Sequence, residues 1–170
     1  MNAFPNLARA GFCYRTRLVH KATGRVLSES VDRNKVPVEG LDLMARALFA
    51  GGAVPAALYI GLHSGTHNPD GTETAANLGL TVSEITSYTS ASRVKFEPGV
   101  VSGGGVSNET TVAVFDFTQA VVVDGAFIST SPAKGAAVGS LLSFVRFQPS
   151  RNVDPSVRLE VIAGFQFLSI

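Results

Sequence analysis

The chain has 170 residues and a mass of 17.8 kDa, the size of a single domain that can bury a substantial core. Only 16% of the residues are charged, and the formal net charge is +1, so no overall field would attract nucleic acid. Hydrophobic residues make up 45% of the chain, but charges interrupt each apolar stretch before it reaches the roughly 18 residues of a membrane span. We therefore expect neither a membrane nor a nucleic acid as a partner.

Positive charge is concentrated in the N-terminal part of the chain. Residues 1–50 hold eight Lys and Arg against four Asp and Glu, although the whole chain is nearly neutral. Cys13 is the only cysteine, which excludes an internal disulfide, and the start Met-Asn-Ala-Phe-Pro lacks the pattern of a secretory signal. We expect a protein that folds in a cytoplasm and docks through its basic end.

The first elements are predicted to be an arm and a hairpin. Residues 1–10 show no periodic pattern and are expected to form an extended N-terminal arm. From Gly11 the residues alternate as in a strand, with Phe12 and Tyr14 on the apolar face. Residues 21–24 suit a turn in which Gly24 adopts a positive φ. Residues 11–36 are therefore predicted to form a β-hairpin.

One α-helix is predicted over residues 37–49. Pro37 suits a first helical turn, and the Gly51-Gly52 pair provides a stop. Helical spacing places a set of apolar residues on one side, which we expect to face the core: Leu41, Met44, Ala45, Leu48 and Phe49.

The remainder of the chain is predicted to be mainly β. Residues 57–62 suit a short buried strand, residues 64–76 an exposed loop, and residues 78–85 one or two helical turns. Further strands separated by turn signals are expected over residues 93–96, 110–117, 121–130, 140–147 and 157–170. This spacing predicts an antiparallel, jelly-roll-like β-sandwich for residues 37–170.

Catalytic and metal-binding patterns are weak. A metal could be held by four side chains, His63, His67, Asp70 and Glu73. The turn residues around them do not form a helix that would present these side chains on one rigid face, so an ordinary solvated loop is favoured. Ser64 occupies the fourth rather than the third place of a nucleophile-elbow pattern. Along an extended strand, Cys13 lies roughly 20 Å from the nearest candidate base, so we expect a buried or half-buried structural thiol. No enzymatic activity, cofactor or metal is predicted.

Basic residues concentrate on the predicted hairpin, with Arg9, Arg15, Arg17, Lys21 and Arg25 all before residue 26. Three interpretations remain open from the residues alone. The basic face contacts an acidic protein surface, contacts nucleic acid, or is simply a solvated side of a sheet, and the nucleic-acid interpretation is the least favoured.

Several short motifs together resemble a family of small virion structural proteins of tailed bacteriophages. The resemblance covers residues 38–170, and the preceding hairpin resembles the N-terminal part of some relatives. The residues that carry it are Ala57-Leu58-Tyr59-Ile60-Gly61-Leu62, Glu84, Tyr88, Arg93, Gly104-Gly105-Val106-Ser107-Asn108, Phe115 and Gly125-Ala126-Phe127-Ile128.

The resemblance implies a non-enzymatic β-sandwich on the virus particle. It predicts a capsid decoration, or cement, protein that is assembled in the host bacterial cytoplasm, binds the major capsid protein and associates with itself as a dimer or trimer. The expected partner-binding residues are Phe4, Leu7, Arg9, Arg15, Arg17, Arg25 and Arg33, with the arginines meeting acidic groups and the arm burying apolar area at a joint. The alternatives are a tail-fibre or baseplate module that binds sugars through residues 64–76, and a metal-dependent hydrolase that uses the His63–Glu73 cluster.

Overall fold

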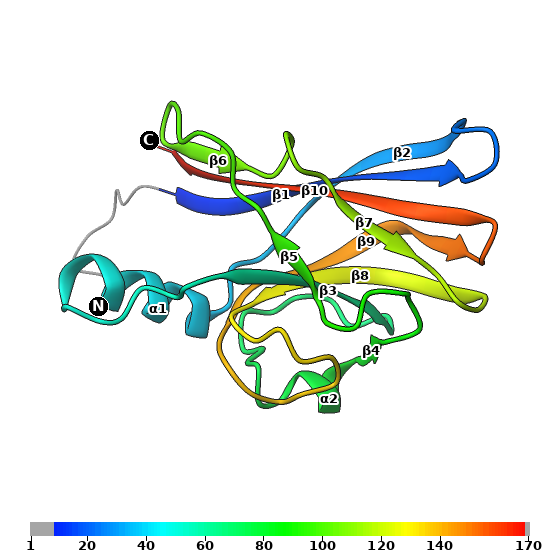
Figure 1. The fold of residues 1–170 in the computed structure, drawn as a ribbon. Coiled ribbons are helices and arrows are strands. Elements are labelled where there is room, and N and C mark those ends of the chain that lie inside the picture. Colours follow the sequence, from blue (N-terminus) through cyan, green and yellow to red (C-terminus); the bar gives the residue numbers. More distant parts are fainter. Residues whose placement is uncertain (1–8, 169–170) are drawn as a thin grey trace.

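The computed structural model describes residues 9–168, which form two antiparallel sheets packed face to face (Figure 1). The fold class predicted from the sequence, an antiparallel β-sandwich with a single long helix, is confirmed. The elements in chain order are β1 (Arg9–His20), β2 (Val26–Arg33), α1 (Val38–Phe49), β3 (Leu58–Ser64), α2 (Leu78–Thr81), β4 (Ser83–Ile85), β5 (Val94–Phe96), β6 (Gly105–Ser107), β7 (Ala113–Asp116), β8 (Val121–Ser129), β9 (Leu141–Val153) and β10 (Val157–Leu168).

The first sheet has the order β2-β1-β10-β6, and β7 also pairs with β10. β1 and β2 form the predicted hairpin, and Gly24 has a φ of +67° at its turn. β1 also pairs with β10 along its whole length, from Arg9 opposite Leu168 to His20 opposite Val157. The hairpin is therefore a continuous part of the main sheet rather than a ribbon lying on it.

The second sheet has the order β4-β3-β8-β9, and β5 also pairs with β3. Two glycines let its side chains approach the backbone closely. A Cβ atom on Gly61 would lie 2.2 Å from the Phe127 ring, and one on Gly125 would lie 2.1 Å from the Val145 carbonyl oxygen. Both glycines belong to the motifs that carry the family resemblance, so these motifs serve packing inside the sheet.

The core fills the space between the two sheets. The alternation in β1 places Phe12 and Tyr14 inside, and β10 contributes Leu159 and Val161, all of which are buried. Each fully buried large side chain stabilises the fold by about 1.5–3 kcal/mol. The same alternation turns Cys13 outward, where it is exposed. The predicted buried or half-buried thiol is therefore wrong, because its neighbours in sequence occupy the inner face.

Helix α1 begins after Pro37 and lies directly on β9, as a Cβ atom on Gly40 would be only 2.7 Å from the Leu142 carbonyl oxygen. Leu43 and Met44 pack against the core. The remaining apolar side chains of the predicted core face are exposed, with Phe49 at 87%. That expectation is wrong for four of its five residues, which are Leu41, Ala45, Leu48 and Phe49. The helix meets the sandwich along one narrow line at Gly40, which leaves its other sides uncovered within residues 9–168.

Some boundaries differ from the predictions. Residues 78–85 divide into α2 and β4, and β6 lies between the strands expected over residues 93–96 and 110–117, where no strand was predicted. The loop over residues 64–76 was expected to be exposed, but Gly71, Glu73 and Ala75 are buried in it.

Candidate interaction surfaces

Arg15 and Arg17 of β1 are engaged within the molecule. Arg15 forms an ion pair with Glu109, and Arg17 Nη2 lies 3.0 Å from Glu160 Oε2. The Arg15–Glu109 pair is exposed on both sides, so it contributes little stability, whereas the Glu160 side chain is only 10% exposed. The outer face of β1 is nevertheless not a stripe of free positive charge, because acidic groups of the same chain neutralise it.

Arg25 and Arg33 lie at the two ends of β2 and are exposed. Within residues 9–168, neither has a carboxylate partner within 4.0 Å. Arg9 is the first residue of β1, and the predicted contact residues Phe4 and Leu7 lie outside the described part of the chain. Among the expected arginine contacts whose side chains the structure describes, Arg25 and Arg33 are therefore the ones left available to an acidic partner.

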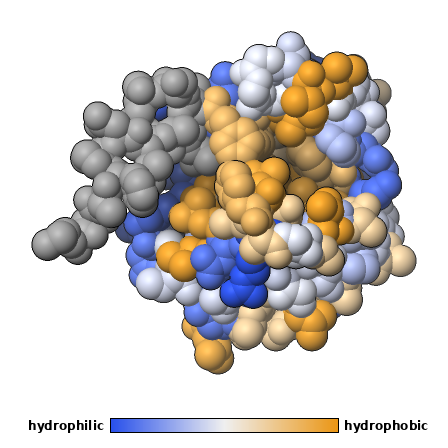
Figure 2. Space-filling model, turned by 90° about the vertical axis from the view of Figure 1, so that its left-hand side faces the viewer, coloured by the Kyte–Doolittle hydropathy of each residue, from blue (hydrophilic) through white to orange (hydrophobic). Residues whose placement is uncertain are grey.

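A shallow apolar pocket of about 120 Å³ opens at the end of the sandwich where β1 begins and β10 ends. It is lined by Phe12, Val106 and Phe165 of the first sheet, Leu58 and Leu142 of the second, and Met44 of α1. Figure 2 shows this end of the molecule, where hydrophobic side chains gather around a hollow. Further exposed apolar side chains in α1, β10 and the loop before β6 are Leu48, Phe49, Val100, Val101 and Phe167. We call the pocket and these side chains the apolar end.

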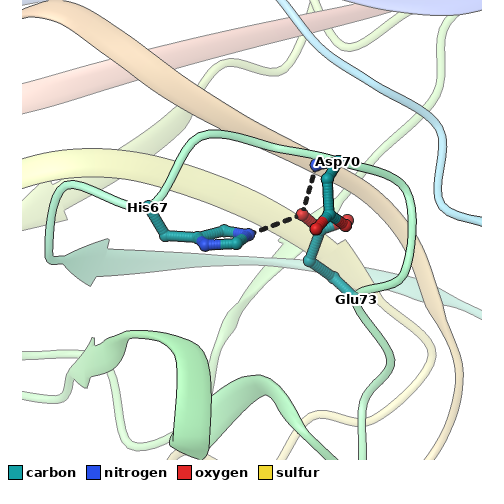
Figure 3. A group of neighbouring side chains, drawn as sticks. All are labelled: His67, Asp70 and Glu73. Carbon is teal, nitrogen blue, oxygen red and sulfur yellow. Dashed lines mark hydrogen bonds and ion pairs between the residues drawn. The ribbon is translucent and has the colours of Figure 1, made fainter.

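The structure brings together three of the four residues considered as metal ligands. Figure 3 shows His67, Asp70 and Glu73, whose potential ligand atoms lie within 4.8 Å of one another. Glu73 accepts hydrogen bonds from His67 Nε2 and the Asp70 amide through Oε1, and from the Gly71 amide through Oε2. Burial opposes ionisation of Glu73, but these hydrogen bonds lower its pKa. Through these hydrogen bonds, the cluster holds the loop over residues 64–76 in place.

His63, the fourth candidate, lies inside the second sheet and outside this cluster. Its Nε2 lies 3.0 Å from the Val145 carbonyl oxygen, to which it donates a hydrogen bond, and its ring stacks on Phe144 with 4.6 Å between centroids. Burial lowers the pKa of His63 to about 4, so the ring is neutral near pH 7. His63 therefore contributes to packing inside the second sheet.

Glu84 and Arg93 form a buried ion pair that the sequence did not reveal. Arg93 Nε lies 2.9 Å from Glu84 Oε1, and Arg93 Nη2 lies 2.8 Å from Glu84 Oε2. Arg93 also donates to the carbonyl oxygens of Ser131 and Ala136, and Glu84 accepts from the Gly135 amide. The pair therefore holds the loop between β8 and β9 against the sheet. Both residues appear in the family motif, but the motif gives no sign that they meet.

Asn108 fills a gap in the first sheet. β10 pairs with β6 near one end and with β7 further along, and Asn108 lies between these two partners. Its Nδ2 donates to the Val161 carbonyl oxygen at 3.0 Å, and its Oδ1 accepts from the Ala163 amide at 2.7 Å. The side chain thus replaces the missing strand hydrogen bonds, which explains an asparagine at the end of the Gly-rich motif.

Comparison with known proteins assigns no family. No protein-family model matches the chain, and no curated protein matches it significantly. Within residues 9–168, neither helix is long and apolar enough to cross a membrane.

Proposed function

We propose that this chain is a non-enzymatic structural protein of a tailed-bacteriophage particle. Its role would be that of a capsid decoration, or cement, protein that binds the lattice of the major capsid protein and stabilises the head. One observation carries the proposal. The sandwich uses its buried charges to fix its own loops, while the apolar end remains on its surface together with Arg25 and Arg33, which have no carboxylate partner within residues 9–168.

The apolar end supports a role in assembly. A soluble monomer rarely exposes large clustered apolar side chains, and such patches mark sites of association. Here Phe49 is 87% exposed and Val100 is 91% exposed. Covering these side chains in an assembled shell would remove them from water and stabilise the contact.

Charge supports docking on an acidic surface. Arg25 and Arg33 are exposed at the ends of an edge strand, and their guanidinium groups suit bidentate contacts with carboxylates. A few such contacts are weak for one molecule. On a lattice of identical subunits, linked copies gain avidity, so modest contacts give stable attachment.

Binding to purified capsids that lack the protein tests this proposal. We expect R25E to lower occupancy and to weaken the salt dependence of attachment, because the variant removes a charge that pairs with the capsid. K95E makes the same change of charge on β5, in the other sheet and outside the proposed charge contact, and should bind as the natural protein does. Equal occupancy by R25E and the natural protein at low salt would contradict the charge contact.

The alternative is a tail-fibre or baseplate module that contacts host surface sugars. The observation that favours it is the loop over residues 64–76, which Glu73 holds in one conformation while Thr66, Asn68 and Thr72 remain exposed. Copy number separates the two locations. A shell protein is present in hundreds of copies per particle, and a tail module in far fewer.

A further inference from the structure

The apolar pocket has the size and lining for a single side chain. Its volume is about 120 Å³, and a closed apolar cavity of about 150 Å³ is known to hold a benzene ring. Phe12 and Phe165 line it with ring centroids 4.9 Å apart, and Met44 of α1 also contributes to the lining. Since the lining residues are all apolar, the occupant should be an aromatic or aliphatic side chain.

The chain supplies such side chains close to the pocket. β1 begins at Arg9, three residues before Phe12, and eight residues precede it. These eight residues include Phe4 and Leu7 and could span roughly 26–29 Å if fully extended. The segment therefore adjoins the apolar end and is long enough to reach beyond its own sandwich.

Strand direction favours a pocket on another copy. Arg9 still pairs with Leu168, so β1 continues in its strand direction for three residues beyond Phe12 before residues 1–8 begin. Pro5 restricts Phe4 to extended backbone conformations, which suits a segment that reaches outward.

We infer that residues 1–8 of one copy dock through Phe4 and Leu7 in the apolar pocket of a neighbouring copy. Exchange of these arms would join the molecules and cover the apolar end. This inference names the self-association of the proposed virion protein and rests on the proposed function for its biological setting. Arm exchange itself is a property of the purified protein, so it is tested with purified protein.

Sedimentation equilibrium of the full chain measures the association constant of this contact. We expect concentration-dependent self-association, and F4A with L7A should weaken its association constant at least about tenfold because two apolar side chains lose their burial site. N2A with N6A changes two polar residues of the same segment and should associate normally. A monomer at all concentrations, or equal association by both double variants, would overturn the inference.

Cross-linking identifies the occupant. In chains that carry C13S, one copy with F4C is mixed with another copy with M44C under mild oxidation. We expect a disulfide between the two different chains. A chain that carries both F4C and M44C distinguishes the alternative, since a bond formed only within one chain, or in neither experiment, would overturn arm exchange.

The two proposals fail separately. Monomeric protein that is nevertheless abundant on virus heads would overturn arm exchange alone. Arm exchange in a protein absent from virus particles would overturn the virion role alone.

Discussion

The Glu84–Arg93 region and the apolar end differ in which side chains they bury and which they expose. Around Arg93, a bidentate ion pair, backbone hydrogen bonds and the nearby face of Phe127 satisfy a charge that is almost fully buried. At the apolar end, Phe49 and Val100 project from the surface instead. The fold thus closes its loops with polar contacts in one region and leaves apolar area uncovered in another.

On the proposed function, the Glu84–Arg93 region serves stability and the apolar end serves association. Buried charges that bond the backbone of their own chain fix the domain, and their removal should reduce its stability. Exposed apolar side chains contribute little to the fold of one molecule and become valuable when a second surface covers them. Substitutions in the two regions should therefore separate folding from assembly.

The largest effect is expected from Arg93→Met. Removal of the guanidinium leaves Glu84 buried without its partner, which should lower the free energy of unfolding by about 3–5 kcal/mol. K95M removes a cation from the Lys95–Glu97 pair on the surface and should have no measurable effect. Urea unfolding of both variants measures the difference, and equal stabilities would refute the role assigned to the buried pair.

A pH effect of similar size is expected from His63. Burial lowers the pKa of this histidine from its usual 6.5 to about 4, so between these values the unfolded chain binds more protons than the native one. The free energy of unfolding should therefore fall as pH decreases from 6.5 to 4, by roughly 3 kcal/mol from this residue. H63Q should flatten that slope in pH-dependent urea unfolding, whereas H20Q, at a surface histidine, should retain it.

A smaller loss is expected from Gly125→Ala. The new Cβ atom would meet the Val145 carbonyl oxygen and His63 Nε2, and overpacking of this kind costs about 1–3 kcal/mol. Gly79, in α2, has open space around its Cβ position, so G79A is a matched control that should not destabilise the fold. Thermal unfolding should show a lower Tm for G125A only.

The smallest effect on the monomer is expected from Phe49→Ala. Because this side chain is 87% exposed, its loss should change the free energy of unfolding by no more than about 0.5 kcal/mol. F115A removes a fully buried ring and should cost about 3–5 kcal/mol. A large loss for F49A in the dilute monomer would show that α1 packs more fully than its exposure indicates.

Strand periodicity could be predicted well because it is local. Alternation in β1 identified inner positions such as Tyr14, and the turn at Gly24 marked the hairpin. The helix was also predicted to within a residue of its start, but its orientation was not. An amphipathic pattern shows that a helix has an apolar side without showing what covers it.

Contacts between distant residues could not be predicted. Glu84 and Arg93 are nine residues apart, and the loop they hold follows some forty residues later, so their pairing depends on how the second sheet closes. The internal partners of Arg15 and Arg17 were missed for the same reason, since Glu109 and Glu160 reach β1 only through the folded sheet. The apolar pocket likewise assembles side chains from both sheets and α1.

Counting copies on intact virus particles tests the central claim most directly. Quantitative mass spectrometry of purified particles, scaled to the major capsid protein, would give the number of copies per particle. The account predicts hundreds of copies, which capsid lattices emptied of the protein would regain when it is added back. A handful to a few dozen copies would place the protein in the tail, and its absence from particles would contradict the virion role.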